Sequence, residues 1–327
     1  MRLRNPTLFN SRYARWIVYG FVIFIALFIL STNSISFTRD NGFDLSDALV
    51  PQSEILAGGP GRDGIPAIDH PHFVSAMEAD YLKDNDRILG LVYDGVIRAY
   101  PIKILNHHEI VNDKINQQAI VISYCPLCGS GVAFKPDLNG NNSFGVSGLL
   151  YNSDMLLYDR ETESLWSQII GTAITGKLKG NELKVLVLEN TSWSAWRQQH
   201  PTTQVLSTST GDFRNYDRHP YGDYDVNRGL YFPVANNSSR YHPKERVLGL
   251  RIGNKTKAYP VSELEKNARA SFADKFSGQD LTIKYDSKSK TVKVLDAQQN
   301  AIPATMLFWF AWYAFHPGTE VFVSPVK

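Results

Sequence analysis

Short runs of β-favouring apolar residues, separated by polar and turn-forming residues, recur along most of the 327-residue chain. Such runs predict a protein built mainly of β-strands. The expected strands are residues 88–93, 96–100, 119–124, 130–134, 154–159, 247–252, 281–285 and 291–295. Helices are expected only as short segments, at residues 101–110, 192–199, 260–267 and 306–314. The pattern therefore predicts an α+β fold of largely antiparallel sheets with short helices.

Two parts of the chain repeat each other in the same order. The matching segments are DRILGLVYDGVIRAYPIKIL (86–105) with ERVLGLRIGNKTKAYPVSEL (245–264), and WSAWRQQHPTTQVL (193–206) with WFAWYAFHPGTEVF (309–322). In the first pair, β-rich runs flank a tight turn and end in Ala-Tyr-Pro, which is typical of a hairpin leading into a short helix. We expect a degenerate internal duplication, with a first repeat unit at 65–240 and a second unit at 241–327. His200 and His316 occupy equivalent places, and each is expected to cap the helix before it.

The N-terminal region predicts a membrane anchor. Residues 16–37 carry no charge, and about 20 apolar residues suffice to cross a bilayer. Residues 1–15 contain four arginines and no acid, which favours a cytoplasmic tail. We therefore expect a single-pass inner-membrane protein with a linker at 38–64 and the bulk of the chain in the periplasm. A cleaved signal peptide is the alternative, and it would export the same residues.

The charge of the exported part argues against one class of partner. Without the four N-terminal arginines, 30 basic residues face 32 acidic ones, and no stripe rich in lysine or arginine is present. Proteins that bind nucleic acids usually carry such a stripe. We therefore expect no nucleic-acid partner.

Both cysteines of the chain, Cys125 and Cys128, lie in the segment YCPLCG. A Cys-x-x-Cys pair places two sulfurs in one turn, where they can hold a thiophilic metal or close into a disulfide. Zn²⁺ or Cu⁺ would need further ligands, and His108 is the best candidate because it precedes the strand that ends at Cys125. Glu109 and Asp113 are candidates to orient its imidazole.

Two other functions remain open for the cysteines. A Cys-Pro-x-Cys turn is similar to the active turn of dithiol–disulfide exchange proteins. The segment after Cys128, however, is a predicted strand rather than a helix whose N-terminus would stabilise a thiolate. The pair is alternatively a structural element of a non-catalytic envelope module. Whether the protein is an enzyme stays open.

A second polar segment, YNSDMLLYDRETESLWSQ, contains a possible polar cleft formed by Asp154, Asp159 and Arg160. The two carboxylates would act as acid and base while the arginine fixes an anion. The alternative is a turn between strands, in which Asp159 accepts local N–H groups and Arg160 pairs with Glu161 or Glu163.

Several segments together resemble one bacterial family, the domain of unknown function 3179. The segments are GIPAID (64–69), RAYPIKILNHHEIVND (98–113), YCPLCGSGVAF (124–134), FGVSGLLYNSDMLLYDRETESLWSQ (144–168) and the Trp-x-x-Trp-x-x-x-His-Pro-x-Thr stretch that begins at 193. The resemblance spans roughly residues 64–320 and implies little about mechanism. The family pattern has His108 and Glu109 but an aromatic residue at 107 and no histidine at 70 or 72, so His108 is the more significant histidine. The leading hypothesis is a copper or zinc site formed by the two cysteines and His108.

Overall fold

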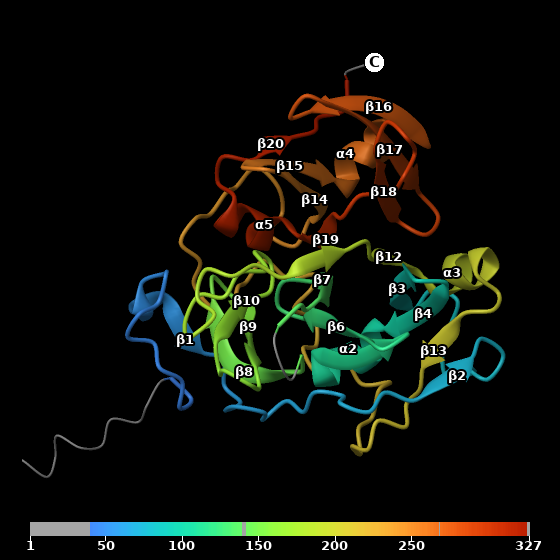
Figure 1. Ribbon diagram of the computed structural model, residues 1–327. Coiled ribbons are helices and arrows are strands. Elements are labelled where there is room, and N and C mark those ends of the chain that lie inside the picture. The colour runs from blue at the N-terminus through green and yellow to red at the C-terminus, as the bar shows by residue number, and fades with distance from the viewer. Residues whose placement is uncertain (1–39, 139–141, 268, 326–327) are drawn as a thin grey trace, which may run out of the picture. The chain divides into compact units, whose positions relative to one another are not determined.

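The computed structural model describes residues 40–138, 142–267 and 269–325 (Figure 1). The chain divides into two units, Met1–Arg39 and Asp40–Lys327. The predicted cytoplasmic tail and membrane anchor, residues 1–15 and 16–37, lie outside the described residues. Within the part of the chain that is described, no helix combines the length and the apolar character that a membrane crossing requires.

The described residues form five sheets. In spatial order, the first sheet contains β1 (Ile55–Ala57), β8 (Phe144–Tyr151), β9 (Asp154–Asp159) and β10 (Leu165–Ser167). The second sheet contains, again in spatial order, β11 (Lys184–Leu186), β7 (Ser130–Lys135), β6 (Gln118–Cys125) and β5 (Ile110–Ile115). The third contains β12 (Glu189–Ser192), β3 (Arg87–Tyr93), β4 (Val96–Pro101), β13 (Gln204–Leu206) and β2 (Phe73–Ser75).

The remaining two sheets come from the C-terminal part of the chain. The fourth contains β19 (Thr305–Phe308), β14 (Arg246–Ile252), β15 (Lys255–Pro260) and β20 (Glu320–Val321). The fifth contains β16 (Ser271–Phe276), β17 (Gln279–Asp286) and β18 (Thr291–Leu295). The short helices are η1 (Gln52–Glu54), α2 (Ile102–His108), α3 (Trp193–Gln199), α4 (Val261–Asn267) and α5 (Trp309–Phe315). Pairing is antiparallel except between β4 and β13 and between β15 and β20.

The prediction of strand-dominated antiparallel sheets with short helices is therefore confirmed. The main difference concerns residues 306–314, which were expected to be helical throughout. Residues Thr305–Phe308 instead pair with β14, and the helix begins only at Trp309. The expected helix 101–110 is also shorter, because Glu109 adopts a φ of 59° that ends α2. A residue with positive φ cannot continue a right-handed helix.

The third and fourth sheets share one strand order. The series β12-β3-β4-β13 corresponds to β19-β14-β15-β20, and in each series the last pairing is parallel. In each case a short helix, α3 or α5, connects the first strand to the last. Each of these helices ends at a histidine C-cap, His200 or His316, as the sequence predicts.

The same two sheets use a glycine in the same way. A Cβ atom added at Gly90 would lie 2.3 Å from the Trp196 ring, and one at Gly249 would lie 2.3 Å from the Trp312 ring. Both tryptophans are buried. Each glycine is therefore required because an indole packs directly on the strand backbone.

The expected linker, residues 38–64, contributes to the first sheet. Strand β1 pairs with β8, with Ile55 opposite Tyr151. Phe43 and Ile55 are each only 4% exposed. This part of the segment is therefore folded against the first sheet.

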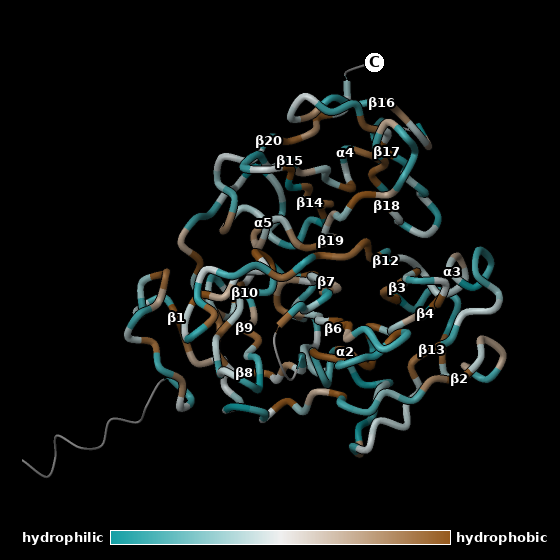
Figure 2. The backbone as a smooth tube through the Cα atoms, viewed as in Figure 1, coloured by the Kyte–Doolittle hydropathy of each residue, from teal (hydrophilic) through white to brown (hydrophobic). Residues whose placement is uncertain are grey.

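The hairpin that carries the cysteines lies where the N-terminal and C-terminal sheets meet. Figure 2 shows hydrophobic residues following the strands and hydrophilic residues in the connecting loops. Cys125 and Cys128 belong to a buried cluster that also includes Phe308 and Trp309. The Phe308 N–H donates to the Cys128 carbonyl at 2.8 Å. A residue of the fourth sheet therefore stabilises the turn that carries the cysteines.

Candidate functional site

The two cysteines occupy the turn between β6 and β7. Cys125 pairs with Ser130 at the end of the hairpin, and the Cys128 N–H donates to the Cys125 carbonyl at 3.2 Å. Gly129 has a φ of 61°, and a Cβ there would lie 2.9 Å from the Phe308 ring. Glycine is therefore favoured at this position, because a side chain would be strained at this φ and would clash with the Phe308 ring. Both thiols are free, and their residues are 1% and 0% exposed.

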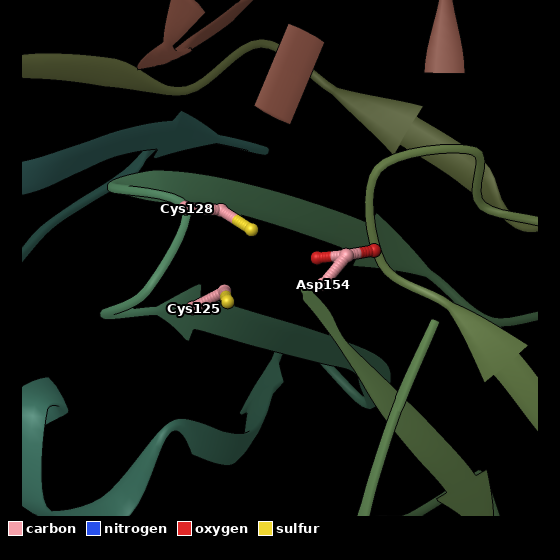
Figure 3. A group of neighbouring side chains, drawn as sticks. All are labelled: Cys125, Cys128 and Asp154. Carbon is pink, nitrogen blue, oxygen red and sulfur yellow. The ribbon is translucent and has the colours of Figure 1, made fainter. Parts of the chain in front are cut away.

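Asp154, the first residue of β9, completes a cluster with these thiols. Figure 3 shows its carboxylate and the two sulfurs directed toward one another. One ligand atom from each of Cys125, Cys128 and Asp154 lies within 4.8 Å of the others. The Oδ2 atom of Asp154 accepts the Ile169 N–H at 3.0 Å and the Ser167 hydroxyl at 3.3 Å. The Oδ1 atom is buried and has no hydrogen-bond partner among the described residues.

Burial controls the protonation of this cluster. Desolvation raises the pKa of Asp154 to about 7. Desolvation, with contributions from Cys125 and Asp154, also raises the pKa of Cys128 well above its usual value. Loss of water disfavours every anion in the group, and three neighbouring anions would also repel one another. At neutral pH the Cys128 thiol therefore keeps its proton and the Asp154 carboxyl is about half protonated, unless a cation joins them.

A long segment between β13 and β14, residues 207–245, covers the thiols. Its Tyr224 is 1% exposed, and the hydroxyl is buried without a partner among the described residues. Burial raises the pKa of Tyr224, and negative charge on Cys128 or Cys125 raises it further. Segments of this length without regular structure are uncommon in compact domains and are usually either functional or linkers. The phenol is thus a second unpartnered polar group beside the thiols.

The His108 ring is hydrogen-bonded to residues outside the cysteine cluster. One ring nitrogen, Nδ1, lies 2.8 Å from the Pro66 carbonyl, and Nε2 lies 2.7 Å from the Tyr216 hydroxyl. The side chain is fully buried, and burial lowers its pKa. Both nitrogens therefore have partners, and the described metal-type cluster contains Asp154 instead of this imidazole. The ring links α2 to the covering segment.

The expected orienting residues, Glu109 and Asp113, also have other partners. The Glu109 carboxylate accepts the Tyr221 hydroxyl at 3.2 Å, and burial raises the pKa of Glu109 to about 7. The Asp113 carboxylate is bound by Arg98 and by the Tyr100 hydroxyl. No hydrogen bond joins either carboxylate to the imidazole within the described ranges. Asp113 therefore joins β5 of the second sheet to β4 of the third, and Glu109 anchors the covering segment.

The polar cleft expected from Asp154, Asp159 and Arg160 is not formed as one site. The two aspartates stand at opposite ends of β9, about 17 Å apart at about 3.4 Å per residue. Asp159 accepts the Thr162 N–H at 2.6 Å, the local role that was the alternative. Arg160 pairs with Asp69 at 2.8 Å rather than with Glu161 or Glu163. Only Asp154 reaches the cysteines.

The partnership of Asp154 with the cysteines was missed from the sequence. One signal was present, because an aspartate stands at each end of the apolar run MLLY (155–158). A carboxylate in a strand that is buried along its whole length needs a partner. Which partner it has depends on how β9 is placed beside the β6–β7 hairpin, and local sequence does not specify that.

Comparison with known proteins agrees with the resemblance drawn from the motifs. A family model described as "Protein of unknown function (DUF3179)" matches residues 62–319. No curated protein and no solved structure matches the chain. Because the family model covers most of the chain, the protein belongs to the DUF3179 family.

Proposed function

We propose that the protein binds Zn²⁺ through Cys125, Cys128 and Asp154. The observation that carries this proposal is the Oδ1 atom of Asp154, which is buried without a partner in the described part of the chain and belongs to a carboxylate directed at two free thiols. A buried carboxylate oxygen without a hydrogen bond is costly, and a cation would satisfy it. His108, the ligand expected from the sequence, is replaced in this proposal by Asp154.

The donor set favours zinc over copper. Zinc accepts thiolates at about 2.3 Å and carboxylate oxygens at about 2.0–2.2 Å, whereas Cu⁺ prefers soft ligands only. Two thiolates on a tetrahedral zinc ion lie about 3.8 Å apart. The ligand atoms of the cluster already lie within 4.8 Å of one another, so small rotations would suffice. A fourth position would be left for water or the Tyr224 hydroxyl.

Charge balance supports the same choice. Two thiolates, one carboxylate and Zn²⁺ give the site one net negative charge. The Lys244 Nζ lies 3.5 Å from the centre of the Tyr224 ring. Burial lowers the pKa of Lys244 to about 8, and negative charge on Asp225 and Cys128 opposes that shift. This ammonium would offset the remaining charge, and zinc binding would release the protons that burial keeps on the apo cluster.

Dithiol–disulfide exchange is the second candidate. The Asp154 carboxylate neighbours Cys128, and burial raises its pKa to about 7, so it would accept the Cys128 proton as the cysteines reduce a partner disulfide to two thiols and close into their own disulfide. Against this, the residues after the turn form β7 instead of a helix, and burial disfavours the Cys128 thiolate. A purely structural cysteine pair is the third possibility, and it leaves the Asp154 oxygen unexplained.

Metal analysis of the anaerobically purified protein tests the proposal. We expect stoichiometric zinc in the wild type and its loss in Asp154→Asn and Cys125→Ser. Asp159→Asn is the matched control, since Asp159 is equally buried on the same strand but distant from the thiols. A metal-free wild type whose thiols cycle reversibly would favour the redox candidate, and zinc retained in Asp154→Asn would refute the proposed ligand set.

We further infer that the two halves derive from a duplicated unit and that only the first retains the metal site. The segment DLTIKYD (280–286) corresponds to AIVISYC (119–125), so Asp286 stands where Cys125 stands in the first half. Its carboxylate accepts the Ser289 hydroxyl at 2.6 Å and the Lys288 N–H at 2.9 Å. That carboxylate closes a turn in the second half, where the sequence contains no cysteine.

The proposed cellular setting follows from residues 1–37. We propose that the uncharged segment 16–37 anchors the chain in the inner membrane and that the site faces the periplasm. Protease digestion of spheroplasts tests this, because an exported domain would be cleaved from outside the cell while a cytoplasmic one would survive.

A further inference from the structure

A cavity of about 490 Å³ lies beside the cysteine turn. Tyr124, Pro126 and Gly129 form one wall, and Tyr224 forms part of another. Tyr224 also belongs to the buried cluster that contains the thiols. The cavity is therefore a neighbour of the proposed zinc site, and half of its remaining lining residues are charged.

Two arginines in this cavity lack carboxylate partners. Arg246 makes no side-chain hydrogen bond or ion pair within the described ranges, and its Nη2 atom is buried without a partner. Arg87 donates only to neutral oxygens, those of Asn190 and Ser289. Burial lowers the pKa of both guanidinium groups, and the charge of Arg246 lowers that of Arg87 further. The two cations are thus close enough to repel each other.

Equivalent sequence positions bring these arginines together. Arg87 is the first residue of β3, and Arg246 is the first residue of β14, the corresponding strand of the fourth sheet. Each aligns with the other in the segments DRILGL and ERVLGL. The junction of the two halves therefore places a pair of matched guanidinium groups at one cavity.

The other charged groups of the cavity do not neutralise this pair. Asp86 is paired with Lys103 at 3.4 Å. The Lys244 ammonium donates to backbone carbonyls, including that of Gly229 at 2.7 Å. Asp225 also lines the cavity and attracts Arg246 electrostatically, but it forms no ion pair within 4.0 Å in the described part of the chain. A positive charge excess therefore remains on the walls.

We propose that this cavity binds a small organic anion whose phosphate or carboxylate group is held by Arg246 and Arg87. Guanidinium groups bind both kinds of anion with paired N–H donors. A pair of partly buried cations without a carboxylate in contact is unfavourable, and an anionic ligand would reduce that cost. The cavity volume lies within the usual range for small-molecule sites, about 300–1,000 Å³. Inorganic phosphate would fill only part of it.

Binding measurements on the full chain in detergent test the proposal. Inorganic phosphate, phenyl phosphate and benzoate are titrated calorimetrically, with chloride at matched ionic strength as the reference. We expect phenyl phosphate or benzoate to bind more tightly than inorganic phosphate, and the tighter of the two identifies the preferred group. Equal responses to all three anions and chloride would overturn the proposal.

Variants separate a ligand role from a structural one. We expect Arg246→Gln to weaken binding at least tenfold and to raise the melting temperature in anion-free buffer, because it removes an unpaired buried charge. The control is Arg251→Gln, an exposed arginine on the same strand that lines another cavity. Full binding by Arg246→Gln, or a lower melting temperature for it without anion, contradicts the proposal. If Arg246→Gln fails to fold, Arg246→Lys keeps the charge but loses the planar fork, and undiminished binding by Arg246→Lys would also refute it.

The zinc proposal and the anion proposal can be tested separately. Cys125→Ser abolishes the proposed zinc site but leaves the arginines in place. We expect this variant to bind phenyl phosphate or benzoate with wild-type affinity, and loss of that binding would show that the cavity depends on the thiol turn.

Discussion

The most informative perturbation is Asp154→Asn, studied by the pH dependence of stability in the metal-free protein. Burial raises the pKa of Asp154 from 3.8 to about 7. The folded state therefore holds a proton that the unfolded state loses near pH 4. Stability contributed by the protonated form is fully present below pH 3.8 and is lost as the pH rises to about 7, above which the loss is complete.

The size of this effect follows from the shift. A change of about three pKa units corresponds to about 4 kcal/mol of lost stability above pH 7, at about 1.36 kcal/mol per unit. Between pH 5 and pH 8 the expected loss is roughly 2.5 kcal/mol. Asparagine does not ionise, so Asp154→Asn should not show this component. The substitution also costs about 1 kcal/mol at all pH values, because a buried amide NH₂ replaces the unpartnered Oδ1 while the amide oxygen keeps the bonds of Oδ2.

Urea unfolding with a chelator present, at a series of pH values from 5 to 8, measures this difference. Glu109, His108 and His316 also titrate with altered pKa values, but they are present in both proteins. Subtracting the two curves therefore isolates Asp154. The reasoning is refuted if the free energy of unfolding of the wild type, relative to the variant, does not fall between pH 5 and pH 8.

Zinc should reverse the direction in which the stability of the wild type changes with pH. Its ligands must be deprotonated, so the stabilisation by zinc should grow from pH 5 to pH 8. The same titration of the wild type with zinc in place of chelator measures it. Asp154→Asn should gain far less stability from zinc, and an equal gain in both proteins would exclude the carboxylate as a ligand.

Three further predictions concern the surroundings of the site. His108→Gln should lower the melting temperature by releasing the covering segment but should retain zinc by metal analysis, and loss of zinc would make the imidazole a ligand after all. Gly129→Ala should destabilise the protein by about 1–3 kcal/mol in urea unfolding, because its φ is 61° and the added Cβ meets Phe308. Chelator should lower the melting temperature of the wild type but not that of Cys125→Ser, and an equal response in both would argue against a thiolate-bound metal.

Much of the fold could be predicted from local pattern. The hairpins expected within the matching segments 86–105 and 245–264 are found as β3–β4 and β14–β15. Residues 306–314 were the exception, because an apolar run of this composition suits a buried helix as well as a buried strand. The split at Trp309 follows from long-range pairing of β19 with β14 and from the bond between Phe308 and the Cys128 carbonyl. Such long-range contacts cannot be predicted from a short stretch of sequence.

The candidate site was predictable only in part. Cys-x-x-Cys identifies the sulfurs because both lie in one turn, and the turn geometry is local. The third member, Asp154, follows Cys128 by two strands, β7 and β8, which belong to different sheets, so its place is set by sheet packing. His108 precedes the thiols in sequence, but Pro66 and Tyr216 hold its ring, and both come from distant segments. Chain proximity was therefore a poor guide to spatial proximity.

The junction of the two halves explains why one site would survive the proposed duplication. The second half supplies Phe308, which binds the Cys128 carbonyl, and Arg246, which meets its counterpart Arg87. The first half supplies the thiols and Asp154. Where the second half would need its own thiols, Asp286 forms a turn instead. In this account the second half is retained because it packs against the cysteine turn and lines the cavity beside it. A packing position such as Gly249 therefore matches its counterpart Gly90, whereas the two cysteines have no counterparts.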